Sequence, residues 1–140
     1  IIFILQDISR SITNYQDKES GLWFQVLDQG DRKGNYLESS VSAMFVYALA
    51  KAVRNKYIDR SYWDMAKRAY QGLINKLVEV EQNNGLTHLT QVCSVGALSG
   101  NPYRDGSYEY YLSEPVVTND LKGVGPFIMA SLEMEDPVKE

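Results

Sequence analysis

Apolar side chains recur at helical spacing in four stretches of this chain, separated by polar turns and loops. Two stretches, about residues 4–15 and 61–79, are apolar on one face only. This pattern predicts helices that pack on one side and face water on the other. The second begins at Ser61-Tyr-Trp-Asp64, which has the spacing of a capping box with Asp in place of the usual Glu or Gln.

The other two stretches, about residues 41–53 and 123–132, are apolar or small nearly all round. Helices of this kind are buried, so both are expected to be interior. In the first, charge appears only at Lys51 and Arg54, in the last turn, where it complements the helix dipole. In the second, Pro126 is expected in the first turn, where proline is tolerated.

The predicted order of helices is therefore outer, inner, outer, inner. If such helices alternate around a barrel, the inner ones run parallel and their N-termini lie at one end. The segments entering those N-termini, 21–38 and 104–122, are the two loops richest in aromatic and polar residues. The pattern predicts a single functional rim. Between them, Asn83-Asn-Gly85 predicts a turn, and residues 86–95 fit either a short strand or irregular structure.

Composition narrows the class of protein. A chain of 140 residues that is 44% hydrophobic and 23% charged is typical of one globular domain, here 1–140 as a single piece. A net charge of -4 argues against a nucleic-acid partner, and no apolar stretch is long enough to cross a membrane. Cys93 is the only cysteine and His88 the only histidine, which exclude Cys-based and multi-His metal sites. We expect both side chains to be structural, with no metal and no cofactor.

The segment 102–115 suits a polar, flat-sided ligand such as a carbohydrate, because aromatic faces contact sugar rings while charged groups bond hydroxyls and carboxylates. It holds four tyrosines and several charged residues, namely Tyr103, Arg104, Asp105, Tyr108, Glu109, Tyr110, Tyr111 and Glu114. A solvated tyrosine-rich surface loop is the alternative interpretation.

Four motifs in this order resemble the unsaturated rhamnogalacturonyl hydrolases of glycoside hydrolase family 105, which are related to the unsaturated glucuronyl hydrolases of family 88. The resemblance extends over about residues 15–133. The motifs are Gly21-Leu-Trp-Phe-Gln-Val-Leu-Asp28, Asn35-Tyr-Leu-Glu-Ser-Ser40, Arg104-Asp-Gly-Ser-Tyr-Glu-Tyr-Tyr111 and Asn119-Asp-x-Lys-Gly-Val-Gly-Pro-Phe127.

The resemblance implies an all-α fold: the C-terminal part of an (α/α)6 barrel, with alternating outer and inner helices, long rim loops and the remainder of the barrel as partner. It also implies hydrolysis of oligosaccharides that end in a 4,5-unsaturated uronic acid, commonly linked to rhamnose. An Asp protonates the double bond, water adds at C5, and the hemiketal opens without any cofactor.

The family's catalytic Asp, its partner Asp, its His and its Trp-x-Arg-Gly-Asn-Gly-Trp motif belong to an N-terminal portion that this sequence does not contain. We therefore expect no catalytic residue here and no activity from these residues alone. Any targeting peptide would lie upstream, which leaves cytoplasmic and periplasmic locations open. The alternative function is a non-catalytic helical carbohydrate-binding or scaffold module.

Five residues are candidates for substrate binding: Trp23, Gln25, Arg104, Tyr108 and Tyr110. Trp23 either stacks on a sugar or covers the barrel end, and Gln25 either lines the site or is structural. Arg104 either binds a uronate carboxylate or pairs with Asp105 or Glu109. Tyr108 and Tyr110 would share one face of an extended segment, with Tyr111 packed inward.

At the helix starts, Glu38 is expected to interact with the N-terminus of the 41–53 helix, with Ser39 as its cap. Asp120 is expected to cap the last helix. Gly123 and Gly125 are expected to permit close backbone approach.

Overall fold

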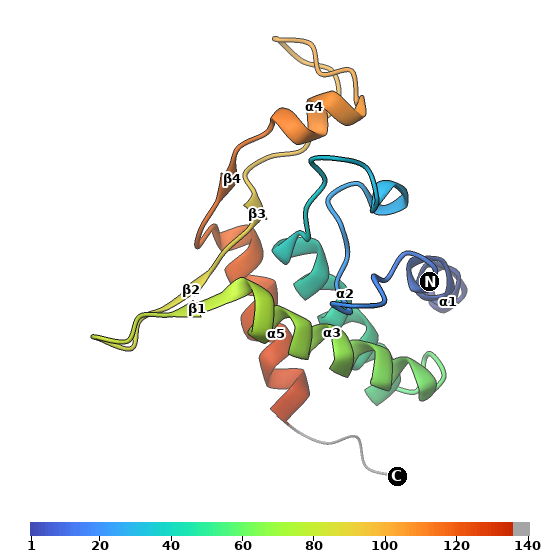
Figure 1. The fold of residues 1–140 in the computed structure, drawn as a ribbon. Helices are drawn as coiled ribbons and strands as arrows, with labels where there is room; N and C mark the ends of the chain where they lie inside the picture. The colour runs from blue at the N-terminus through green and yellow to red at the C-terminus, as the bar shows by residue number, and fades with distance from the viewer. Residues whose placement is uncertain (136–140) are drawn as a thin grey trace.

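The computed structural model describes residues 1–135 and is built mainly of α-helices, with two small antiparallel ribbons (Figure 1). In chain order the elements are α1 (Ile2–Thr13), the 3-10 turn η1 (Leu27–Gln29), α2 (Ser39–Arg54), α3 (Ser61–Leu77), β1 (Val78–Val80), β2 (Thr87–Leu89), β3 (Val92–Cys93), α4 (Tyr108–Ser113), β4 (Val116–Val117) and α5 (Leu121–Glu135). Within these residues no helix is both long and apolar enough to cross a membrane.

Helix α2 lies at the centre of the structure, with α3 and α5 packed against it (Figure 1). Eight of its residues are buried, and they lie on most sides of the helix. The prediction of an interior helix is therefore confirmed. Helix α3 buries Ala66, Ala69, Leu73 and Leu77, as its one-sided pattern predicted. Gly72 lets α3 approach the preceding loop closely, because a β-carbon there would lie 2.1 Å from the Ser20 carbonyl oxygen.

Two expectations about helix starts were wrong. Ser61 does not cap α3: it is the first helical residue, and its amide donates to Asp59 Oδ1 at 2.8 Å. Helix α5 begins at Leu121, so Pro126 lies in its second turn rather than its first. Because proline has no amide hydrogen, it cannot bond the carbonyl four residues earlier. Gly123 does approach Val92 closely, but nothing lies within 4 Å of a β-carbon at Gly125.

The outer helix α1 and the inner helix α5 are less buried than their patterns suggested. Only Ser9 and Ile12 of α1 are buried, while Ile4 and Ile8 are 60% and 50% exposed. On α5, Leu121 and Leu132 are 81% and 59% exposed. Each helix therefore presents an apolar face that no residue within 1–135 covers.

Two ribbons extend from the helices. In one, β1 pairs with β2 in the register Glu79↔His88, and Gly85 turns the chain between them with φ +73°. In the other, β3 pairs with β4 in the register Val92↔Val117 and carries residues 94–115 outward (Figure 1). We call this projecting segment, which contains α4, the tyrosine lobe.

Glu133 ties the end of α5 to the end of α2. Its carboxylate accepts from Lys51 Nζ at 2.9 Å and from Arg54 Nε at 2.8 Å, and its side chain is 13% exposed. Burial acts to raise the pKa of Glu133, but the hydrogen bonds and charges of Lys51 and Arg54 outweigh it, so the pKa is lowered.

Replacing Glu133 with Gln in the full-length protein should lower the free energy of unfolding by about 1 to 2 kcal/mol near pH 7. A carboxyl group whose pKa is lower in the folded state than in the unfolded state stabilises the fold at pH values above its unfolded-state pKa. This stability is lost as the pH falls through the folded-state pKa. The deficit should therefore shrink toward zero as pH falls below about 4. Urea unfolding at several pH values measures it. Exposed Glu135→Gln, in the last turn of α5, is the matched control, and equal deficits for the two variants would contradict the assignment.

Candidate active-site pocket

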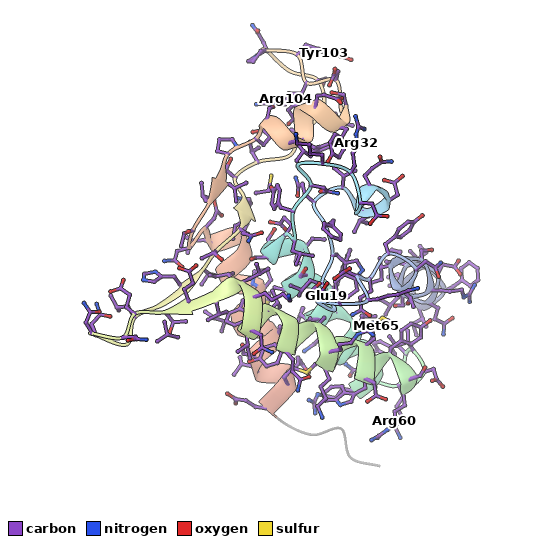
Figure 2. The ribbon with its side chains drawn as sticks, viewed as in Figure 1. Glu19, Arg32, Arg60, Met65, Tyr103 and Arg104 are labelled. Atoms are coloured by element: carbon purple, nitrogen blue, oxygen red, sulfur yellow. The ribbon has the colours of Figure 1, made fainter. Side chains whose placement is uncertain are left out.

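A pocket of about 370 Å³ lies where the segment before α2, the β3 ribbon, the tyrosine lobe and the start of α5 come together. Its lining combines aromatic, aliphatic and hydrogen-bonding side chains: Phe24, Gln25, Leu27, Glu38, Ser40, Val41, Cys93, Gly96, Tyr111 and Lys122. Residues from both predicted rim loops are therefore in its wall. Figure 2 shows Arg32 of the first loop directly below the lobe that carries Tyr103 and Arg104.

Glu38 is the most buried charged group of the pocket, with 2% of its surface exposed. Its Oε1 accepts from the Cys93 amide at 2.8 Å, and its Oε2 accepts from the Val41 amide at 2.6 Å. The Ser40 hydroxyl lies within hydrogen-bond distance of both oxygens. The carboxylate is thus the N-cap of α2 and at the same time anchors β3.

Ser39 is not the cap that the sequence suggested. It is the first residue of α2 and is fully buried. Its amide donates to the Gln91 carbonyl at 3.0 Å and its hydroxyl donates to the Thr90 carbonyl. Glu38 and Ser39 together therefore fasten the strand that leads into β3 against the start of α2.

The first rim loop, residues 21–38, is also held against the start of α2. The Trp23 amide donates to Ser42 Oγ at 3.1 Å, and the Glu38 amide donates to the Trp23 carbonyl at 2.9 Å. Gln25 then lies at the pocket wall, with its Nε2 3.1 Å from Cys93 Sγ. Cys93 is buried, as predicted, and its thiol donates to the Val95 carbonyl at 3.2 Å.

Tyr36 has a buried hydroxyl that makes no hydrogen bond within residues 1–135. Burial, together with the nearby Cys93 and Glu38, raises the pKa of Tyr36. The Tyr36 hydroxyl therefore stays protonated at neutral pH.

Lys122 is the cation of the pocket wall. Its ammonium lies 2.8 Å from Asp120 Oδ1, which also accepts the Lys122 amide hydrogen at 2.9 Å. Hydrogen bonds from the Lys122 side chain and amide lower the pKa of Asp120. Asp120 thus caps the start of α5, as expected, and partly neutralises Lys122.

Trp23 lies in the core and not at the rim. It is fully buried, its indole Nε1 donates to the Ile12 carbonyl at 2.8 Å, and its ring meets Phe45 edge-on at 5.1 Å. No ring face is open to a sugar in this structure, so the stacking role is wrong here. The covering role is the one that the geometry supports.

The tyrosines were expected on an extended segment, but Tyr108–Ser113 form the helix α4. Ser107 caps this helix by accepting from the Tyr110 amide at 3.1 Å. Tyr108 and Tyr110 consequently do not share a face: Tyr108 reaches the first loop, whereas the Tyr110 hydroxyl accepts from the Ala97 amide. Tyr111, expected to pack inward, is the tyrosine that lines the pocket.

Arg104 lies within the tyrosine lobe, in an antiparallel bridge with Ser99, and is not part of the pocket wall. Neither ion pair expected for it is present among residues 1–135. Asp105 accepts the Ser107 amide hydrogen, and Glu109 pairs with Arg32.

His88 is a structural residue, as predicted. Its Nε2 lies 2.7 Å from Glu81 Oε1 and its Nδ1 lies 2.8 Å from Asn119 Nδ2, so it joins the β1–β2 ribbon to the segment before α5. No group of His, Cys, Asp and Glu among the described residues has an arrangement suited to a metal ion.

The sequence candidates missed several pocket residues, notably Phe24, Ser40, Tyr111 and Lys122. Two sequence signals could have found them. Phe24 is an aromatic residue next to Gln25 in the segment that enters the first rim loop, which marks it as a candidate for the same site. Residues flanking a predicted helix start, such as Ser40 and Lys122, are natural lining for a site at helix N-termini.

The model of Glycosyl Hydrolase Family 88 matches residues 1–137, and the chain belongs to this family. Two curated relatives are Protein Atu3128 of Agrobacterium fabrum and the 24.9 kDa protein in the picA locus of Rhizobium radiobacter. Both are 41% identical over 121 residues, which are 82% of this chain and 52% of each relative. The chain thus spans about half the length of these relatives.

Solved structures described as members of family 105 have the same arrangement of helices. A family 105 glycoside hydrolase from C. acetobutylicum ATCC 824 matches with a TM-score of 0.92 and 49% identity, over 96% of this chain and 37% of that one. A possible family 105 member from Salmonella enterica matches with a TM-score of 0.67 and 25% identity, over 95% of this chain and 32% of that one. A possible family 105 member from Klebsiella pneumoniae has the same fold, with a TM-score of 0.70 and 24% identity over 96% of this chain and 31% of that one.

Replacing Glu38 with Ala should destabilise the full-length protein by about 2 to 4 kcal/mol, because two buried amide donors would lose their acceptor. Glu38→Gln keeps one acceptor oxygen and should cost less. Ser40→Ala, which leaves the carboxylate in place, is the control and should cost about 1 kcal/mol or less. Chemical denaturation measures all three. The capping role would be contradicted if Glu38→Ala proved as stable as Ser40→Ala.

Proposed function

We propose that these residues are the C-terminal part of an (α/α)6-barrel glycoside hydrolase that releases 4,5-unsaturated uronic acid from pectin-derived rhamnogalacturonan oligosaccharides by hydration of the double bond. The observation that carries the proposal is the pocket between the two rim loops in a chain of family 88. Its mixture of aromatic faces and hydrogen-bonding groups suits a sugar ring.

Within the pocket, the roles divide by chemistry. Phe24 and Tyr111 supply aromatic surface, while Gln25 and Ser40 supply groups that can bond sugar hydroxyls. Lys122 supplies positive charge for a carboxylate or an oxygen-rich ligand, moderated by Asp120. The pocket lining does not include Arg104, Tyr108 or Tyr110. These residues would therefore contact only an oligosaccharide long enough to extend beyond the pocket.

The proton for the double bond should come from outside this chain. Among residues 1–135, Glu38 is the only carboxyl group in the pocket wall, and both of its oxygens already accept backbone and hydroxyl donors. Because both oxygens hold parts of the backbone in place, neither is free to turn toward a substrate. This agrees with an acidic residue supplied by the preceding part of the barrel.

The exposed apolar faces of α1 and α5 also support a further part of the barrel that packs on these residues. Phe3, Ile4 and Ile8 on α1, and Ile128 and Leu132 on α5, are each at least half exposed. Further helices of a barrel would cover such surfaces. By this proposal, residues 1–140 alone should be inactive and poorly soluble.

The direct test follows the ultraviolet absorbance of the double bond while the full-length protein acts on lyase-generated rhamnogalacturonan fragments. Loss of absorbance together with release of the neighbouring sugar is expected. Absence of any loss on all unsaturated uronides offered would overturn the proposal and favour a non-catalytic carbohydrate-binding or scaffold module.

Gln25→Ala should lower kcat/KM for such a substrate about three- to tenfold, the effect of one lost hydrogen bond to a bound sugar. Gln71→Ala, on the exposed face of α3, removes the same side chain away from the pocket and should leave kcat/KM unchanged. Initial rates measured by absorbance compare the two. Equal rates for both variants would remove Gln25 from the site.

A further inference from the structure

Two sets of contacts tie the tyrosine lobe to the rest of the described residues: the β3–β4 ribbon and the contacts with residues 32–34. The ribbon is short, two residues in each strand, extended by one bond from the Ser94 amide to the Pro115 carbonyl. A two-stranded ribbon of this length is weak by itself. The second attachment therefore decides where the lobe lies.

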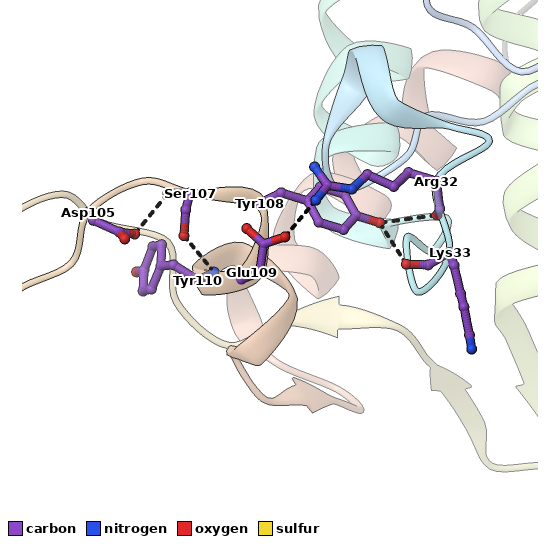
Figure 3. Close-up of polar contacts among 7 residues, drawn as sticks. All are labelled: Arg32, Lys33, Asp105, Ser107, Tyr108, Glu109 and Tyr110. Carbon is purple, nitrogen blue, oxygen red and sulfur yellow. Dashed lines mark hydrogen bonds and ion pairs between the residues drawn. The ribbon is translucent and has the colours of Figure 1, made fainter.

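Figure 3 shows this second attachment, which we call the clamp: Arg32, Tyr108 and Glu109. The guanidinium of Arg32 lies 3.7 Å from the centroid of the Tyr108 ring, within the range of a cation–π interaction. The same guanidinium pairs with Glu109 at 2.5 Å. The Tyr108 hydroxyl lies 3.1 Å from each of the carbonyl oxygens of Arg32 and Lys33, to which it donates.

Inside the lobe, other contacts tie α4 to the segment that follows β3. The Tyr110 hydroxyl accepts from the Ala97 amide at 3.1 Å, and the Tyr110 and Tyr111 rings are 5.0 Å apart. Asp105 and Ser107 fix the entry to α4 through hydrogen bonds to the amides of Ser107 and Tyr110 (Figure 3). A displacement at the clamp would consequently move Tyr111 and Gly96, which are pocket wall.

We propose that Arg32 and Tyr108 are positioning residues, which hold the tyrosine lobe closed over the pocket and so set the placement of Tyr111 against a bound sugar. Neither residue lines the pocket. Their effect reaches it through α4. The kinetic part of this inference rests on the proposed function, but the closed position of the lobe does not.

Cys93 provides a readout that needs no activity. Its thiol lies in the pocket wall beneath the lobe and is 6% exposed. If the lobe opens more often, a thiol reagent reaches Cys93 faster. Labelling is followed by mass spectrometry of the peptide that contains Cys93, which separates it from any other cysteine of the full-length protein.

Four variants of the full-length protein are compared with wild type, one of which, Arg32→Lys, keeps the positive charge without the planar guanidinium. Arg32→Ala removes both contacts of the guanidinium, Tyr108→Phe removes only the two carbonyl bonds, and Lys33→Ala is the matched control. Figure 3 shows the Lys33 side chain directed away from Tyr108, so the control removes a neighbouring positive charge and leaves the clamp intact.

Arg32→Ala should label Cys93 about tenfold faster and Tyr108→Phe about threefold faster, with Lys33→Ala equal to wild type. With an unsaturated disaccharide as substrate, Arg32→Ala should raise KM about fivefold and change kcat less than twofold. Arg32→Lys should bring KM only part of the way back to the wild-type value, because an ammonium group cannot stack on the Tyr108 ring as a guanidinium does. Circular dichroism confirms that each variant is folded.

Labelling rates of Arg32→Ala and Tyr108→Phe equal to that of Lys33→Ala would overturn the inference. Faster labelling with unchanged KM would overturn the positioning role. If wild type hydrolyses no unsaturated uronide while the labelling differences appear, the proposed function fails and the clamp stands.

Discussion

The arrangement of the pocket depends on one buried carboxylate. Glu38 joins three parts of the chain that are far apart in sequence: the loop containing Trp23, through its amide; the first turn of α2, through Val41; and β3, through the amide of Cys93. Burying an anion is costly unless donors surround it, and here amides and a hydroxyl do so. Because the donors belong to different segments, satisfying the charge also fixes where those segments lie.

Everything closer to solvent is held by weaker and more exposed contacts. Arg32, Tyr108 and Glu109 connect the tyrosine lobe to the first loop through a cation–π contact, an ion pair and two hydrogen bonds at the surface. Such contacts are individually modest in energy. The floor of the pocket, around Glu38 and Cys93, is thus held by buried hydrogen bonds, whereas Tyr111 and Gly96 belong to a lobe held by exposed contacts.

The sequence predicted the helices well because their burial patterns are periodic and local. The near absence of charge from Ser39 to Ala50 is enough to place α2 in the interior, and the one-sided pattern after Ser61 is enough to orient α3. Helix starts were harder, because capping depends on which nearby side chain reaches the amides. Glu38 takes the capping role that the sequence assigned to Ser39, and no side chain caps α3, where Asp59 only accepts the amide hydrogen of Ser61.

Side-chain roles in the loops could not be read in the same way. A tryptophan at position 23 suits sugar stacking and core packing equally well. Its indole is buried because it contacts Ile12 and Phe45, which belong to two different helices. Tyr108 was placed beside Tyr110 because an extended segment was assumed. Once Ser107 caps a short helix, the tyrosines turn to different neighbours, and Tyr111 becomes the one at the pocket.

The same geometry bears on where the proposed chemistry would find its acid. Its pocket carboxylate is committed to holding the backbone, and its pocket cation is partly neutralised by Asp120. Both oxygens of Glu38 are engaged in bonds that hold separate segments together, so the carboxylate has a structural role. Under the proposed function, the described residues offer shape, aromatic surface and hydrogen bonds to a sugar, and the reactive acid comes from a segment that packs on the exposed apolar faces of α1 and α5.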